Sequence, residues 1–144
     1  MKLHTASETI SFAKRLENES VEFYEDLSQR YIKDKDLFLS FIKENGKNVV
    51  QIERTYYGVI TDAIEGCFAF DIESDEYAIE TTLAENAGYY DALGKAIEIE
   101  EKIGKFYTDA AEQSKALMAD VPRTFVRIAK KRGERIAKLK TLQG

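Results

Sequence analysis

The 144-residue chain carries two sequence motifs twice, and this repetition narrows the folds open to it. The motif Ala-x3-Glu-x5-Phe-Tyr-x-Asp runs from Ala13 to Asp26 and again from Ala96 to Asp109, which places its two glutamates 83 residues apart. A second motif, Phe-x4-Lys-x2-Gly, runs from Phe38 to Gly46 and from Phe125 to Gly133. The order of the four copies indicates two related helical hairpins.

Four segments have apolar residues at helical spacing. The first opens with Thr5-Ala6-Ser7-Glu8, a capping-box pattern, and the last has Pro122 in its first turn. The expected helices run from Thr5 to about Tyr31, from Asp34 or Asp36 to about Gly58, from about Tyr90 to Ser114, and onward from Asp120. Residues 59–89 lack one sustained period, so we expect a long crossover that includes a short helix.

Composition indicates one soluble helical domain spanning residues 1–144. Charged residues make up 33% of the chain and hydrophobic residues 44%, with one proline and no tryptophan. No apolar run approaches the roughly 20 residues of a membrane span, and Met1–Thr5 does not begin a signal peptide, so we expect a cytoplasmic protein. A net charge of −5 argues against nucleic acid as a partner. The lone Cys67 is expected to be a small buried residue.

Each expected helix carries polar residues on its inward face near its middle. A buried polar side chain is unfavourable unless it is paired, so six of them at one level predict a shared network or a ligand. The six are Glu17, Asn45, Asn48, Glu100, Arg132 and Arg135. Glycines near the same level, Gly46, Gly104 and Gly133, are expected to let the helices approach closely around the arginines.

The segments from Ala13 to Tyr24 and from Ala96 to Tyr107 resemble the first and third helices of the rubrerythrin-related, ferritin-like di-iron proteins. The resemblance covers about residues 5–142. It implies an all-α, ferritin-like four-helix bundle in which Glu17 and Glu100 occupy metal-ligand positions. In that family the second and fourth helices each carry a Glu-x-x-His pair. Alignment of the second motif places these pairs at Asn45-x-x-Asn48 and Arg132-x-x-Arg135, where the ligands are lost.

The residues present argue against a di-iron centre. Such a centre needs about four carboxylates and two imidazoles, whereas arginine has no acceptor and a permanent positive charge. The only histidine, His4, precedes the first helix. Two carboxylates and two guanidinium groups sum to zero charge, so we predict that Arg132 and Arg135 neutralise Glu17 and Glu100 in place of metal. Tyr24 and Tyr107, two turns from the glutamates, are expected to be core rings whose hydroxyls find buried partners.

Three functions stay open at this point. The first is a non-catalytic protein with a degenerate di-iron site, without a cofactor, that has a structural, binding or regulatory role. The second is an iron-dependent oxidoreductase or peroxidase that uses Glu17 and Glu100 with a nearby acid such as Glu44, although Glu44, Glu98 and Glu101 are expected to be solvated. The third is a bundle that binds a small ligand or anion through its arginines. We expect a homodimer.

Overall fold

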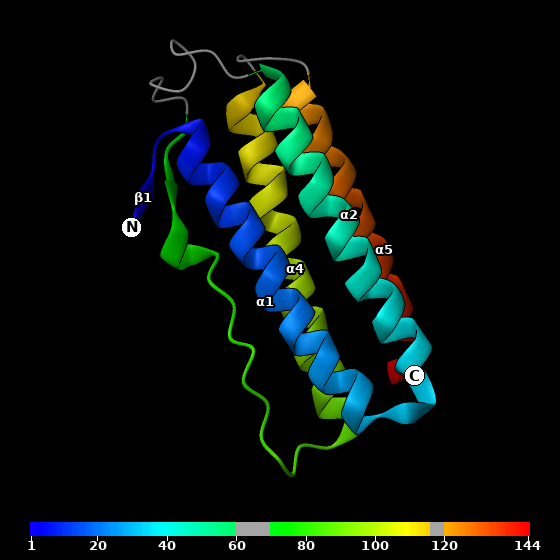
Figure 1. Ribbon diagram of the computed structural model, residues 1–144. Coiled ribbons are helices and arrows are strands. Elements are labelled where there is room, and N and C mark those ends of the chain that lie inside the picture. Colours follow the sequence, from blue (N-terminus) through cyan, green and yellow to red (C-terminus); the bar gives the residue numbers. More distant parts are fainter. Residues whose placement is uncertain (60–69, 116–119) are drawn as a thin grey trace.

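The protein is a bundle of long helices joined by one extended crossover (Figure 1). The structure is a computed structural model that describes residues 1–59, 70–115 and 120–144. Within these ranges four long helices occur: α1 (Ala6–Arg30), α2 (Lys35–Val59), α4 (Tyr89–Ser114) and α5 (Asp120–Gln143). The expected helix boundaries are therefore confirmed to within about one residue. Cys67 and residues 60–69 of the expected crossover lie outside the described residues.

Local sequence signals account for the start of α1 and for its reversal into α2. The Thr5 side chain accepts a hydrogen bond from the Glu8 backbone amide, and the Glu8 carboxylate accepts one from the Thr5 amide, each at 3.1 Å. This capping box satisfies amides that a helix start leaves free. The one-turn helix η1 (Ile32–Asp34) then joins α1 to α2. So short a connection makes the two helices antiparallel.

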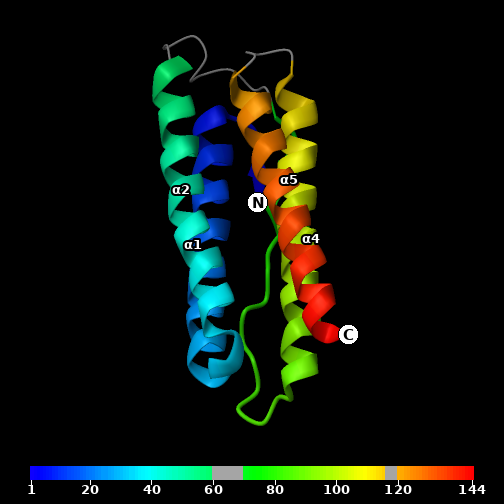
Figure 2. The ribbon, with the colours of Figure 1, turned by 90° about the vertical axis from the view of Figure 1, so that its right-hand side faces the viewer.

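The helices pack mainly in sequence pairs, α1 with α2 and α4 with α5 (Figure 2). The two pairs repeat the same aromatic contact: Tyr24 lies 6.1 Å from Phe38, and Tyr107 lies 5.8 Å from Phe125, between ring centroids. These residues occupy matching positions of the two repeats. The predicted duplication of a helical hairpin is thus visible in the packing of the core.

The crossover runs along the bundle antiparallel to α4 (Figure 1). Three side chains of α4 form hydrogen bonds with its backbone. Gln113 accepts from the Asp71 amide, Lys102 donates to the Ala78 carbonyl, and Lys95 donates to the Thr82 carbonyl. Near its beginning, β2 (Ile72–Glu73) pairs with β1 (Lys2–Leu3) in a two-stranded antiparallel sheet, followed by the one-turn helix η2 (Ser74–Glu76). The strand pairing was not predicted.

None of the helices in the described ranges is long and apolar enough to cross a lipid bilayer.

The interpretation of the mid-helix glycines as points of close approach is wrong for two of them. Gly46 and Gly133 are exposed, and a Cβ built on either one meets no atom within 4 Å. At Gly104 a Cβ would lie 3.8 Å from Arg132 Cβ, an ordinary van der Waals distance. Gly46 and Gly133 therefore carry the conformational cost of glycine without a packing reason.

We expect Gly46→Ala and Gly133→Ala each to stabilise the protein by about 0.5–1 kcal/mol, because alanine loses less backbone entropy on forming a helix. Urea unfolding measures the change. Ala137→Gly, at an exposed position of α5, is the matched control and should destabilise by a similar amount. A loss of stability in both alanine variants would show that the glycines have a role outside the contacts described.

Candidate functional site

The structure brings the six predicted polar residues together in one buried layer at the middle of the bundle. Their accessible surface is 0–1% of the maximum in every case, and hydrogen bonds or ion pairs link them across all four helices. Glu17 comes from α1, Asn45 and Asn48 from α2, Glu100 from α4, and Arg132 and Arg135 from α5.

Arg132 bridges the two glutamates of the repeat. Its Nη1 atom donates to both carboxylate oxygens of Glu100 at 2.8 Å, and its Nη2 atom donates to Glu17 Oε2. Nη1 also lies 3.2 Å from the Ser20 hydroxyl. Because all of these groups are buried, each ion pair acts in a medium that screens charge weakly. The prediction that a guanidinium group neutralises Glu17 and Glu100 is confirmed for Arg132.

Arg135 is held mainly by other groups. Its Nε atom donates to Glu44 Oε1 at 2.8 Å, and its Nη2 atom donates to the Phe41 carbonyl at 2.9 Å and to Asn45 Oδ1. The guanidinium carbon lies 4.9 Å from the centroid of the Phe41 ring, within the range of a cation–π contact. Nη1 lies 3.7 Å from Glu100 Oε1, so Arg135 pairs only loosely with that glutamate.

Glu44 lies at the edge of the polar layer, where it pairs with Arg135. It was expected to be solvated, but its side chain is 27% exposed and ion-paired with Arg135. Glu98 and Glu101 are exposed as expected. With Glu44 included, three carboxylates face two guanidinium groups, and the fully ionised layer has a charge of −1 rather than zero. The long side chain of an inward arginine reaches a carboxylate one position off the inward face.

The two asparagines of α2 both contact Glu17. Asn48 Nδ2 donates to Glu17 Oε1 at 2.6 Å, and Asn45 Nδ2 donates to the Glu17 backbone carbonyl at 3.2 Å. Each asparagine thus presents its amide nitrogen, a hydrogen-bond donor, to the glutamate.

The two tyrosines of the repeat differ in their hydrogen bonding. The Tyr24 hydroxyl donates to Glu100 Oε2 at 3.0 Å, which confirms the prediction of a buried partner. The Tyr107 hydroxyl is buried and has no hydrogen-bond partner among the residues that the structure describes, so for Tyr107 a buried partner stays a prediction. Burial raises the pKa of both hydroxyls far above the usual value, and neither ionises near neutral pH.

Burial raises the pKa of the Glu100 carboxyl to about 7, while the charge of Arg135 and the Tyr24 hydroxyl act in the opposite direction. Burial also lowers the pKa of Arg132, and repulsion by Arg135 adds to this effect. A proton on Glu100 would bring the layer from a charge of −1 to zero. Burial is the main cause of the raised pKa, and the charge of Glu44 adds to it.

Stability should depend on pH through Glu100. A carboxyl whose pKa is raised from 4.5 in the unfolded chain to about 7 contributes stability that is complete below pH 4.5 and is lost as the pH rises through 7. We expect wild-type protein to lose up to about 3 kcal/mol relative to Glu100→Gln between these limits. Urea unfolding of both proteins across this range measures the difference. A difference that does not change with pH would contradict the raised pKa.

The layer does not fit a di-iron centre. All four carboxylate oxygens of Glu17 and Glu100 accept hydrogen bonds from Arg132, Asn48 or Tyr24. A cation between the glutamates would have to displace a guanidinium group of the same sign. Within residues 1–59, 70–115 and 120–144, no three His, Cys, Asp or Glu side chains form a group that could hold a metal ion.

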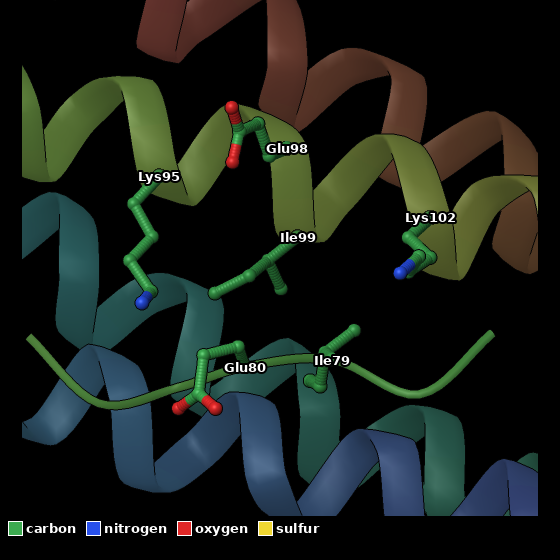
Figure 3. Close-up of a pocket in the computed structure, with 6 residues that line it drawn as sticks. All are labelled: Ile79, Glu80, Lys95, Glu98, Ile99 and Lys102. Carbon is green, nitrogen blue, oxygen red and sulfur yellow. The ribbon is translucent and has the colours of Figure 1, made fainter. Parts of the chain in front are cut away.

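One surface pocket, of about 450 Å³, lies between α4 and the crossover (Figure 3). It is lined by Ile79, Glu80, Lys95, Glu98, Ile99 and Lys102. The amines of Lys95 and Lys102 bind backbone carbonyls of the crossover at 2.5 and 3.0 Å. These lysines therefore fasten the crossover to the bundle, and the lining includes no residue of the polar layer.

Comparison of the chain with protein-family models, with curated proteins and with solved structures found no match.

Proposed function

We propose that the protein is a cytoplasmic, non-catalytic relative of the ferritin-like bundles, in which an arginine–carboxylate network takes the place of a di-iron centre. Its role is then structural, binding or regulatory. Two lines of support come from the chain itself: the resemblance of its duplicated Glu-x5-Phe-Tyr helices to that family, and the position of Glu17 and Glu100 in one buried layer.

The bridging position of Arg132 carries this proposal. Its guanidinium group contacts both Glu17 and Glu100, the two residues that the resemblance places at ligand positions. Arginine keeps its charge at all ordinary pH values in water, and its five N–H donors match carboxylates well. Removal of either partner of a buried pair leaves the other group uncompensated, so these side chains hold one another in place instead of holding an exchangeable ion.

The same contacts count against anion binding by the arginines. Both guanidinium groups are 0–1% exposed and already paired with carboxylates, so an added anion would have to break a buried ion pair. The layer lacks the unpaired cationic group that an anion site requires.

Protein purified from iron-supplemented cells should contain well under one iron per chain and should lack the near-ultraviolet absorbance of an oxo-bridged iron pair. The reason is that donors occupy the carboxylate oxygens a metal would need. Elemental analysis, together with an absorbance spectrum, makes the measurement. Two tightly bound irons per chain would overturn the proposal and favour the oxidoreductase alternative.

We also propose that the protein is a homodimer that uses the outer face of α2. Leu39, Val50 and Tyr57 are 41%, 44% and 71% exposed, and their spacings of 11 and 7 residues place them on one side of the helix. Burial of this apolar face against a second copy would favour association. Sedimentation equilibrium should then give twice the chain mass of 16.4 kDa. A monomer at high protein concentration would contradict this proposal.

A further inference from the structure

Side chains of the polar layer, together with Gln51 and Tyr107, contain buried polar atoms that the ion pairs do not satisfy. Asn48 Oδ1, Gln51 Oε1, Tyr107 OH and Arg132 Nε have no hydrogen-bond partner among the described residues. Arg135 Nη1 also lacks a hydrogen bond, although it lies 3.7 Å from Glu100. Buried polar groups in folded proteins are nearly always paired, either with protein or with ordered water. Four such atoms therefore require a partner that the described residues do not supply.

The two repeats show where this partner belongs. In one half, the Tyr24 hydroxyl of α1 donates to Glu100 of α4. The matching pair in the other half is Tyr107 of α4 with Glu17 of α1. There the Glu17 oxygens are taken by Asn48 and Arg132, and the Tyr107 hydroxyl has no described partner. The half of the layer around Glu17 therefore has polar groups in excess.

We assign four of the five unsatisfied atoms to this half, and the fifth, Arg135 Nη1, lies near Glu100. Asn48 and Arg132 both bind the Glu17 carboxylate, so the other polar atoms of these side chains, Asn48 Oδ1 and Arg132 Nε, lie near it. Gln51 is one helical turn from Asn48 on the same face of α2. The Tyr107 ring packs against Phe125, two turns before Arg132 on α5. The charges of Glu100 and Arg135 act on the pKa of Tyr107, which is consistent with a hydroxyl close to the layer.

We propose that the Glu17 half of the layer is a binding site for an internal water molecule, held by Tyr107, Asn48, Gln51 and Arg132. The four atoms are two carbonyl acceptors, one N–H donor and one hydroxyl that does both. Water offers two donors and two acceptors and matches this set. A metal cation would be repelled by Arg132, and an anion would meet two carbonyl oxygens. This inference goes beyond the proposed function and concerns hydration, not metal content.

The test counts long-lived internal water molecules by ¹⁷O relaxation dispersion in the wild-type protein, in Tyr107→Phe and in Tyr24→Phe. We expect the Tyr107→Phe count to be lower than the wild-type count, because the water loses one of its partners. Tyr24→Phe is the matched control, since its hydroxyl binds Glu100 directly, and its count should not fall. An equal count in Tyr107→Phe and wild type would overturn the proposal.

A crystal structure of the wild-type protein at atomic resolution provides a second measurement that does not depend on the variants folding. It should show an ordered water within hydrogen-bonding distance of Tyr107 OH and Asn48 Oδ1. Direct hydrogen bonds from Tyr107 to a protein group, with no water between them, would overturn the proposal. Neither result depends on iron analysis, so failure of this inference and failure of the proposed function can be told apart.

Discussion

Replacement of Glu100 by alanine should lower the free energy of unfolding by about 3–5 kcal/mol, the usual cost of breaking a buried ion pair. Glu100 accepts hydrogen bonds from Arg132 Nη1 through both oxygens and from the Tyr24 hydroxyl. Alanine would leave these buried donors unpaired and would add a cavity. Urea unfolding at neutral pH measures the loss.

The matched control is Glu98→Ala, two residues earlier on α4. Glu98 is exposed, so its replacement should change stability by about 0.5 kcal/mol or less. The pair of variants controls for helix propensity, because both replace glutamate by alanine in the middle of the same helix. Equal unfolding midpoints for the two variants would show that Glu100 does not belong to a buried ion-pair network.

The second large effect is expected from a variant that rebuilds the family's ligand set. The four replacements are Asn45→Glu, Asn48→His, Arg132→Glu and Arg135→His. Together with Glu17 and Glu100 they supply four carboxylates and two imidazoles in one layer. Without metal, the variant should be less stable than wild type, because four acids would face each other with no buried cation. Binding of Fe(II) or Mn(II) to the folded form should restore stability by about 2.7 kcal/mol at a metal concentration of 100 times Kd.

Thermal melts under anaerobic conditions, with and without Fe(II), measure this gain. The control keeps Arg132 and carries the other three replacements, and it should gain nothing because a guanidinium group stays between Glu17 and Glu100. Wild-type protein should also show no metal-dependent shift. A quadruple variant that folds but does not respond to metal would show that the four positions do not correspond to ligand positions.

The helices could be predicted from the sequence because their signals are local. The capping box of Thr5 and Glu8, the short turn after α1 and the helical spacing of apolar residues each follow from a few neighbouring residues. The pairing of Lys2–Leu3 with Ile72–Glu73 could not be predicted in this way. Strands of two residues have no measurable period, and their partners are far apart in the sequence.

The residues of the polar layer could be predicted because the repeat identifies matching positions on different helices. The choice of partners within the layer could not. Arg132 forms ion pairs with both Glu17 and Glu100. Arg135 forms its closest ion pair with Glu44, a residue that the helical period places off the inward face. A long flexible side chain can reach several acceptors, and the helical period of the sequence does not show which of them it binds. The difference between Tyr24 and Tyr107 has the same origin, since it depends on which donors already occupy each glutamate.

X-ray diffraction at the iron absorption edge, from crystals of protein purified from iron-supplemented cells, tests most directly whether Arg132 stands where a metal would bind. We predict continuous electron density for the Arg132 guanidinium group between Glu17 and Glu100, with no anomalous peak between the two carboxylates. An anomalous peak at that position, with Arg132 turned away from both glutamates, would contradict the proposed replacement of metal by an arginine ion-pair network.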